Sequence, residues 1–238
     1  MSPRDTITSN MTKATTGTRP LARPLRSDAA ANRERILVAA TTVVRRDGER
    51  APMATIADDA GVGIGTLYRH YRTRPALLAA LTLRSFNLVL QHARAAAQSD
   101  EPAPAALAQF FEQTIVARNE FILPLHGGPV IHDERVVALQ TQIRDLLEHV
   151  LARGRRDRTI RADASAIDII ITGAMLAQPL PNAPDWDQLA RRQARIFVAG
   201  LATTDPAPLG SPPTPGPPRG ESIRVADATP TARQQADP

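Results

Sequence analysis

The sequence contains no cysteine, and lysine occurs only once, as Lys13. The absence of cysteine excludes disulfide bridges, thiolate metal sites and a cysteine nucleophile, and it suits a reducing compartment. No run of eighteen apolar residues is present, so the pattern predicts no membrane-spanning helix. The first thirty residues also lack the apolar stretch of a secretory signal. We therefore expect a cytoplasmic protein that has no membrane partner.

Basic residues outnumber acidic ones, 29 to 24, which gives a formal net charge of +5 at neutral pH. All of these basic residues except Lys13 are arginine. We attribute the excess of arginine and alanine to the base composition of a GC-rich genome rather than to function. The charge by itself therefore gives only a mild preference for a polyanionic partner.

Both ends of the chain differ in composition from its middle. Residues 1–26 carry five basic residues against one acid, Asp5, which predicts a disordered basic arm. Residues 203–238 hold nine prolines, which predicts a disordered or extended tail outside any packed core. The arm is either a DNA contact or a passive tail, because its composition fits both.

The middle of the chain, residues 27–202, is rich in alanine and leucine and follows the helical period. It shows no convincing alternation of the kind that predicts strands. Short helical patterns give way to longer ones near residue 76. We therefore predict an all-α fold with a small domain over 27–75 and a larger helical domain over 76–202.

The first predicted helix begins at a cap formed by Ser27 or Asp28 and runs to about Asp47. Its apolar stripe consists of Ile36, Leu37, Ala40, Val43 and Val44. Gly48 can adopt the left-handed conformation that ends such a helix. Pro52 then fits the first turn of a second helix.

A short second helix, a glycine turn and a third helix follow. The inward face of the second helix consists of Ile56, Ala57 and Ala60. Gly61 ends this helix, and Leu67 and Tyr71 of the third helix, four residues apart, face the same core. Two short helices joined at a steep angle by a glycine-containing turn form a helix-turn-helix. An ordinary helical hairpin is the alternative.

The remaining residues of the third helix are suited to contact a nucleic acid. Its N-terminal residues, where backbone N–H groups and the helix dipole favour an anion, are Ile64, Gly65 and Thr66. Gly65 has no side chain, so a sugar-phosphate backbone can approach closely. Tyr68 projects outward, and His70 and Arg74 supply hydrogen-bond donors at the rim. A helix of this size fits the major groove of DNA.

The string IADDAGVGIGTLYRHYRTRPALL resembles the DNA-binding signature of the TetR family of bacterial transcriptional regulators. The match is dense at residues 56–57, 60–62 and 65–70, and NRERILVAATTVVRRDG resembles the first helix of the family. The resemblance implies a three-helix DNA-binding domain followed by an all-helical domain that dimerises and binds an effector. It continues more weakly through the second domain and does not cover the two tails.

The resemblance also implies a set of DNA-binding residues, which are Ile64, Gly65, Thr66, Tyr68, Arg69, His70 and Arg74. Of these, Ile64, Thr66 and Tyr68 would approach bases or the nearby backbone. His70 and Arg74 would hold phosphates. The implied partners are a double-stranded DNA operator, a small-molecule effector and a second copy of the chain.

Several positions depart from the pattern of the family. Tyr71 stands where phenylalanine is common, so its hydroxyl must find a partner or reach water. Arg74 precedes Pro75, which disfavours helical angles at Arg74, so we expect Arg74 to cap the fourth helix rather than begin it. Ala51 and Gly63 replace the usual serine or threonine caps, at a cost of roughly 0.5–1 kcal/mol each.

Five further helices are predicted, over about 76–98, 105–120, 134–153, 163–178 and 185–201. The stretch FILPLHGGPVIH, between the second and third of them, is broken by proline and glycine. The helix over 163–178 is apolar almost all round, which predicts burial on both sides. Asp185 and Gln188 have the spacing of a capping box. Two such C-terminal helices per chain fit a four-helix interface, so we expect a homodimer.

Candidate residues for an effector are Phe86, Phe110, Phe111 and Met175, all of which fit a plain core equally well. His126 and His132 lie near acidic residues, but their spacing matches no closed metal site. We therefore interpret them as part of a solvated loop and predict no metal. The arginines between positions 153 and 161 are interpreted as a solvated helix end.

Three functions remain open at this point. A dimeric repressor that a small molecule releases from a palindromic operator fits best, and a regulator that activates or acts without a ligand would share its sequence features. The third is an all-helical enzyme. It is disfavoured because the sequence shows no Ser-His-Asp order, phosphate-binding glycine loop, metal cluster or cofactor motif. We therefore predict no enzymatic activity and no cofactor.

Overall fold

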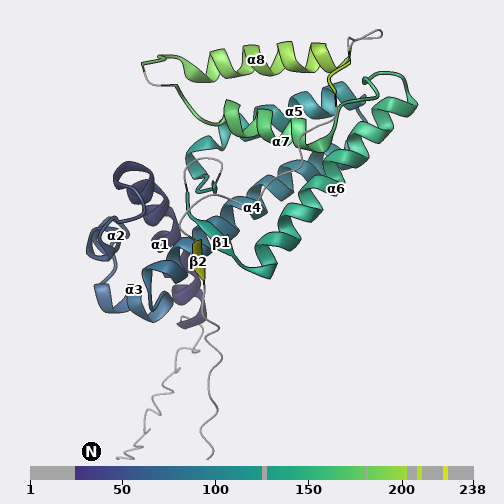
Figure 1. The fold of residues 1–238 in the computed structure, drawn as a ribbon. Helices are drawn as coiled ribbons and strands as arrows, with labels where there is room; N and C mark the ends of the chain where they lie inside the picture. Colours follow the sequence, from purple (N-terminus) through teal and green to yellow (C-terminus); the bar gives the residue numbers. More distant parts are fainter. Residues whose placement is uncertain (1–24, 125–127, 181, 203–207, 211–221, 225–238) are drawn as a thin grey trace, which may run out of the picture.

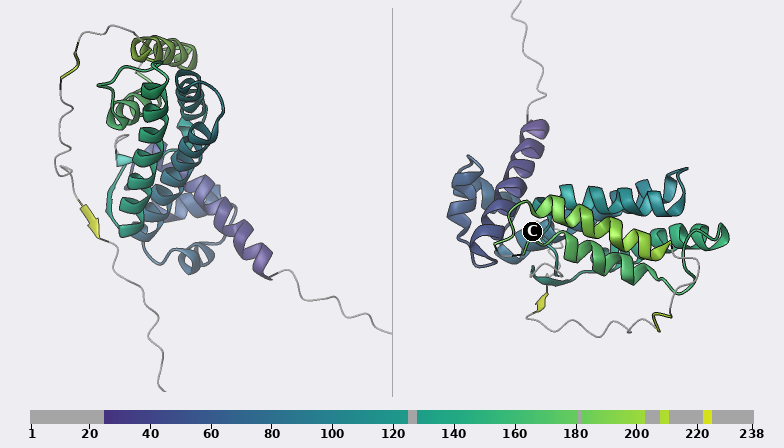
Figure 2. Two further views of the ribbon diagram at one scale, coloured as in Figure 1. Left: turned by 90° about the vertical axis from the view of Figure 1, so that its right-hand side faces the viewer. Right: turned by 90° about the horizontal axis from the view of Figure 1, so that it is seen from above.

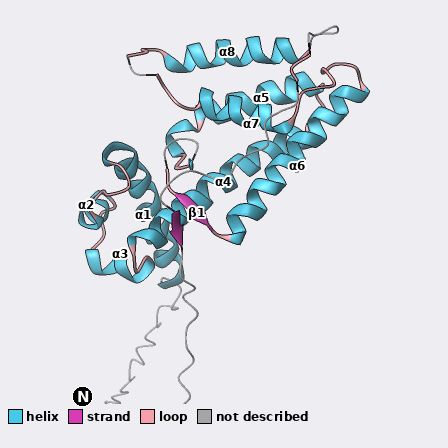
Figure 3. Cartoon of the chain, viewed as in Figure 1, coloured by secondary structure: helices cyan, strands magenta, loops and turns pink. Residues whose placement is uncertain are grey.

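The computed structural model describes residues 25–124, 128–180, 182–202, 208–210 and 222–224. Most of these residues are helical (Figure 1 and Figure 3). The α-helices among them are α1 (Leu25–Asp47), α2 (Met53–Asp59), α3 (Ile64–His70), α4 (Arg74–Gln98), α5 (Ala103–Val116), α6 (Glu134–Arg156), α7 (Ala166–Leu176) and α8 (Trp186–Leu201). A short 3-10 turn, η1 (Arg118–Glu120), follows α5. The all-α class predicted from the sequence is confirmed.

α1, α2, α3 and the first turns of α4 enclose one core, and we call this part of the molecule the first domain. The side chains at its centre include Ile36, Val43, Ile56, Leu67 and Leu77. The stripe predicted on the first helix is thus the buried face of α1. Gly48 has a φ of +80°, as the left-handed end of a helix requires. The predicted cap at Ser27 is not observed, because α1 already begins at Leu25. At α2 the N-cap is Pro52 rather than Ala51, so Pro52 lies one position before the first turn in which it was predicted.

α4 extends from the first core into a second one, and we call the part of the molecule around the second core the second domain. Its side chains in the first core are Leu77, Leu78 and Leu81, and those in the second are Leu90, Ala93 and Ala96. α6 lies along α4, while α5 lies between α4 and α8 (Figure 1 and Figure 2). α8 therefore forms an edge of the molecule. No helix in the described part of the chain combines the length and apolarity that crossing a bilayer requires.

Several helix ends differ from the prediction. α5 ends at Val116, earlier than expected, and α6 continues to Arg156. The capping box predicted at Asp185 does not form, because Asp185 has a φ of +60° and an N-cap needs an extended backbone to reach the next turn. A capping box forms instead at α7, where the Ser165 amide donates to Asp168 Oδ2 at 2.8 Å.

A short strand, β1 (Val130–His132), lies in the stretch that was expected to be irregular. It pairs in parallel with β2 (Ser222–Arg224), with residue 131 opposite residue 223. Three residues are too few to show alternation, so the sequence pattern did not indicate this pair. The Leu209 amide also donates to Asp163 Oδ2 at 2.9 Å. Two described parts of the predicted tail thus contact loop segments earlier in the chain, whereas positions 1–24 of the predicted arm lie outside the described residues.

Candidate nucleic-acid interface

The turn between α2 and α3 is held by its own backbone hydrogen bonds. Gly61 has a φ of +61°, a conformation that residues with a side chain rarely adopt. The Val62 amide donates to the Ala57 carbonyl at 3.0 Å, and the Gly61 amide donates to the Asp58 carbonyl at 3.0 Å. These two bonds are those of a Schellman motif. Val62 also packs against the core, so the turn fixes where α3 begins.

α3 is anchored by the two residues that the sequence pattern singled out. Leu67 is fully buried, and Tyr71 is 5% exposed. The Tyr71 hydroxyl has no hydrogen-bond partner among the described residues. Burial raises the pKa of Tyr71, while the positive charge of the neighbouring Arg33 and a polar contact with it act in the opposite direction, although that contact lacks the geometry of a hydrogen bond. The hydroxyl expected to find a partner or reach water is therefore buried, neutral and costly.

The outer side of α3 presents Ile64 and Tyr68, which are one turn apart and 44% and 45% exposed. Apart from its own helix and chain neighbours, no described atom lies within 4 Å of where a Cβ atom on Gly65 would stand. Packing among the described residues therefore gives no reason for a glycine at this position. Thr66 Oγ1 accepts a hydrogen bond from Arg69 Nη2 at 2.7 Å, so Arg69 folds back along its own helix.

Arg74 begins α4, and Thr73 caps it by accepting a hydrogen bond from the Ala76 amide at 3.3 Å. The expectation that Arg74 would be the cap is wrong. Pro75 lies in the first turn of α4, where the backbone N–H group that proline lacks would have no partner within the helix in any case, so the helix can begin at Arg74. The Arg74 side chain is half-buried, and its Nη1 donates to the Glu49 carbonyl at 3.1 Å. It therefore ties α4 to the loop between α1 and α2.

The seven residues predicted to contact DNA lie on α3 or at the start of α4. Those that are exposed are Ile64, Gly65, Tyr68 and Arg69, and those that are half-buried are Thr66, His70 and Arg74. Residues 69–74 include three arginines and a histidine but no acid. The C-terminal end of α3 is therefore basic, while its outer side is apolar and aromatic.

The four residues predicted to bind an effector do not share one environment. Phe110 and Phe111 are buried on α5 with their ring centroids 5.6 Å apart, and Phe111 makes a similar edge-to-face contact with Phe197 of α8. Phe86 is half-buried on α4 and packs among several clusters. Met175, on α7, is 68% exposed. Only the two phenylalanines of α5 lie side by side.

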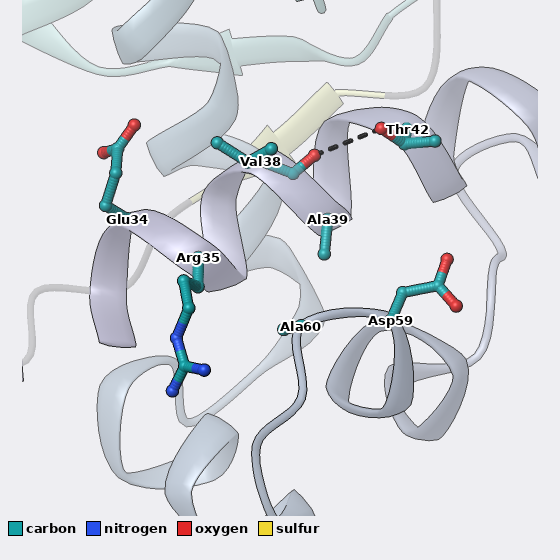
Figure 4. Close-up of a pocket in the computed structure, with 7 residues that line it drawn as sticks. All are labelled: Glu34, Arg35, Val38, Ala39, Thr42, Asp59 and Ala60. Atoms are coloured by element: carbon teal, nitrogen blue, oxygen red, sulfur yellow. Dashed lines mark hydrogen bonds between the residues drawn. The ribbon is translucent and has the colours of Figure 1, made fainter. Parts of the chain in front are cut away.

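A hollow of about 490 Å³ lies between α1 and α2 (Figure 4). Its lining residues are Glu34, Arg35, Val38, Ala39, Thr42, Asp59 and Ala60. None of them belongs to the residues predicted to contact DNA or an effector. Its charged side chains are of both signs, and acidic groups at the rim repel phosphate. We therefore assign the hollow no part in DNA contact.

The sequence pattern did not indicate the contacts between the two domains, in which Arg45, Arg84 and Ser85 take part. Arg45 has the appearance of an ordinary basic residue in the last turn of a helix, so no signal distinguished it. No group of three potential metal ligands occurs in the part of the chain that the structure describes. His132 is exposed in β1, and His126 lies outside the described residues.

Comparison with known proteins agrees with this geometry. The family model for bacterial regulatory proteins of the tetR family matches residues 36–81, from the middle of α1 into α4. A comparison with curated protein sequences gives no match. The match therefore covers the helix-turn-helix and its supporting helices, and leaves most of the second domain to be compared by its fold.

Several solved structures resemble most of the chain. A TetR transcription regulatory protein from Mycobacterium vanbaalenii is 28% identical, with 76% of this chain and 100% of that chain covered and a TM-score of 0.53. The TetR family regulator PfmR from Thermus thermophilus is 18% identical, with 70% and 98% covered and a TM-score of 0.57. AibR, in complex with isovaleryl coenzyme A and operator DNA, is also 18% identical, with 72% and 98% covered and a TM-score of 0.58. The last two likenesses concern the fold.

Proposed function

We propose that this chain is a sequence-specific DNA-binding transcriptional regulator. The match of residues 36–81 and the fold make it a member of the tetR family of bacterial regulatory proteins. The observation that carries the proposal is the outer side of α3. Ile64 and Tyr68 are exposed there beside the open space over Gly65. Exposed apolar side chains on an anchored helix indicate a partner, and the basic run over 69–74 indicates that the partner is an anion.

In this proposal α3 enters the major groove of DNA. Ile64, Thr66 and Tyr68 approach base edges or the adjacent backbone. His70 and Arg74 hold phosphates at the rim, and Arg69 adds positive charge there. Phosphate contacts position the helix, whereas contacts to base edges distinguish sequences. Such a regulator acts in the bacterial cytoplasm, and we assign it no enzymatic activity.

We further propose that two chains form a homodimer through α7 and α8. Both helices carry apolar side chains that a single chain leaves exposed, which are Ile171 (41%), Met175 (68%), Leu189 (44%) and Ile196 (54%). Leu189 and Ile196 are seven residues apart and so share one side of α8. Pairing of these helices across a two-fold axis would cover them and present two copies of α3 to the half-sites of a palindromic operator.

The regulator that we favour is a repressor released from DNA by a small-molecule effector. AibR, which has the same fold, binds both isovaleryl coenzyme A and operator DNA in one structure, and this supports the pairing of two such sites on one chain. In this chain the effector would enter the second domain beside Phe110 and Phe111. Release then follows if the effector binds better to a dimer whose α3 spacing no longer fits DNA.

Close packing around these phenylalanines favours an alternative, a regulator that represses or activates without a ligand. A Cβ atom placed on Gly173 of α7 would lie 3.5 Å from Phe110 Cε1, which is ordinary contact distance. An effector would therefore have to separate α7 from α5 as it binds. That separation breaks van der Waals contacts and so costs energy, whereas a regulator that binds no ligand keeps these contacts intact.

Selection of bound DNA from a random pool tests the proposal, followed by titration of the selected operator against a panel of metabolites and drugs. We expect an inverted repeat with half-site centres roughly 34–36 Å apart or more. A compound that lowers operator affinity at least tenfold supports the repressor, and a panel without effect supports the ligand-independent alternative. A pool that yields no common sequence contradicts sequence-specific binding altogether.

A further inference from the structure

Residues 118–122 connect the two domains, and we call this segment the interdomain latch. It begins with η1, directly after α5 of the second domain. Ile122, at its other end, is 5% exposed and belongs to the core of the first domain. The latch therefore starts in one domain and ends inside the other, so a relative movement of the domains must displace it.

α1 holds the latch through the side chain of Arg45. Arg45 Nη1 donates to the Arg118 carbonyl at 3.1 Å and to the Phe121 carbonyl at 3.3 Å. Its Nη2 donates to Asn119 Oδ1 at 3.3 Å. Two of the three acceptors are backbone atoms. The contact therefore depends on where the latch lies more than on which side chains it carries.

α4 holds the latch from its other side. The buried Ser85 Oγ accepts a hydrogen bond from the Ile122 amide at 2.8 Å. Arg84 forms ion pairs with Glu120 of the latch and with Glu34 of α1. One network of charges and hydrogen bonds thus joins α1, α4 and the latch.

The latch also reaches α8. Arg118 forms an ion pair with Asp187 in the first turn of α8, and the two side chains are 19% and 39% exposed. Burial, and then the positive charge of Arg118, lower the pKa of Arg45. Because Arg45 Nη1 is bonded to the Arg118 carbonyl at 3.1 Å, the two positively charged side chains share one small region of the molecule, where like charges repel. Asp187 supplies negative charge that offsets this repulsion.

We propose that the interdomain latch couples α8 to the DNA-binding domain: Asp187 neutralises Arg118, which keeps Arg45 bonded to the latch and α1 in its place. The inference rests on the proposed function, since it takes α8 as a dimer helix and α3 as the DNA-reading helix. A shift of α8 that withdraws Asp187 leaves the positive charges of Arg118 and Arg45 without a compensating carboxylate. Coupling of this kind is reciprocal, so DNA that fixes α1 also stabilises the position of α8.

The charge argument separates two substitutions that break the same ion pair. Asp187→Asn leaves Arg118 uncompensated beside Arg45, so the latch should open more often. Arg118→Gln removes both the attraction to Asp187 and the repulsion of Arg45, so the latch should stay closed. The double variant should resemble Arg118→Gln alone. A role that depends only on the ion pair as a structural tie predicts equal effects for the two single variants.

Amide hydrogen exchange of the full-length protein measures the opening of the latch without any DNA. We expect exchange over residues 118–122 to rise roughly threefold or more in Asp187→Asn, and to return close to the wild-type rate in the double variant. The matched control is Arg191→Gln, which removes another ion pair of α8, with Glu112 at 2.9 Å. The exposed fraction of Arg191, 36%, is similar to the 39% of Asp187, and its partner Glu112 lies outside the latch. Amide exchange over residues 118–122 should therefore not change in this control.

Operator affinity provides a second readout on the same variants, with the selected DNA as the probe. A loosened α1 makes the two copies of α3 less well preorganised. Asp187→Asn should therefore weaken operator binding by roughly 3- to 30-fold. The operator affinities of Arg118→Gln and of the double variant should agree with each other within about twofold. Sedimentation of each variant confirms that the oligomeric state is that of the wild type.

The outcomes of the two experiments are distinct. If Arg118→Gln accelerates exchange in the latch as much as Asp187→Asn does, or if the double variant is worse than either, the charge coupling is wrong, whatever the protein does with DNA. If exchange follows the prediction but the wild type selects no DNA sequence, the latch stands and the proposed function fails. If Asp187→Asn opens the latch without changing operator affinity, the latch does not control α3, and the coupling is contradicted.

Discussion

Tyr68 and Arg74 differ in their surroundings, and this difference sets what each can contribute. Tyr68 is 45% exposed on the outer side of α3. Arg74 is half-buried and bonded to the Glu49 carbonyl. The sequence predicted both as DNA contacts, but it gave no sign that Arg74 also ties α4 to the loop before α2. Such a tie joins residues 25 positions apart, and no local pattern reports it.

The two residues should therefore fail differently when changed to alanine. Tyr68→Ala should leave the free energy of unfolding nearly unchanged and reduce discrimination between operator and scrambled DNA by about 1–3 kcal/mol, the range for a base contact. Arg74→Ala should lower affinity for both DNAs alike, reduce the salt slope by about one unit and lower stability by about 1 kcal/mol. Salt titrations on both DNAs, with thermal unfolding, measure these effects. If Tyr68→Ala loses equal affinity for both DNAs, Tyr68 contacts only the DNA backbone.

The buried hydroxyl of Tyr71 leads to a prediction about pH. Tyr71→Phe removes an unpartnered polar group from the core and should raise the free energy of unfolding at pH 7 by about 1 kcal/mol. Because burial raises the pKa of Tyr71 in the folded state, the unfolded chain ionises first as the pH rises past about 10. Wild-type stability should then fall relative to that of the variant. Urea unfolding at pH 8 and pH 10.5 measures the difference, and a gap that does not grow with pH contradicts it.

α3 shows which parts of an element a sequence can reveal. A helix of seven residues is too short to be stable alone, so its anchors and its turn must be encoded nearby. The spacing of Leu67 and Tyr71 and the glycine at position 61 did indicate them. The capping box predicted at Asp185 failed because spacing does not report φ. The interdomain latch was missed because Ile122 is simply an apolar residue in a broken stretch until its distant partners are known.

Gly61, in the turn before α3, and Gly65, within α3, should respond in opposite ways to replacement by alanine. Gly61→Ala forces a side chain into a left-handed conformation and should cost roughly 1–2 kcal/mol of stability. Gly65→Ala enters open space and should stabilise α3 by up to about 1 kcal/mol. It should nevertheless weaken operator binding, because the added methyl group stands where the DNA backbone approaches. Chemical unfolding and operator titration separate the two effects. If Gly65→Ala binds operator as well as the wild type, DNA does not approach that position closely.

At the scale of the whole molecule, the sequence predicted two helical domains and a dimer. The arrangement of the helices leaves an apolar surface on α7 and α8 that such a dimer could cover. The helix predicted to be buried on both sides, α7, leaves Ile171 and Met175 exposed in the single chain. A sequence pattern reports that a helix is apolar, but it does not report whether the same chain or a second copy covers it. The effector residues were poorly predicted for a related reason, since core and pocket phenylalanines have the same chemistry.

The dimer surface can be tested by one charge. Ile196→Glu places a carboxylate on the outer side of α8, where it costs little in a single chain but is desolvated in a dimer. We expect sedimentation at micromolar concentration to show a dimer for the wild type and a folded monomer for the variant. Val137→Glu on α6 is the control, because Val137 is 58% exposed and lies off the proposed interface. A variant at position 196 that stays dimeric would place the interface elsewhere.

The central claim, that α3 reads a DNA sequence, is tested most directly by the affinity of the full-length protein for the selected operator and for scrambled DNA of the same length at one fixed salt concentration. The account predicts operator binding tighter by a factor of about 10³ or more. Equal affinities for the two DNAs would contradict it.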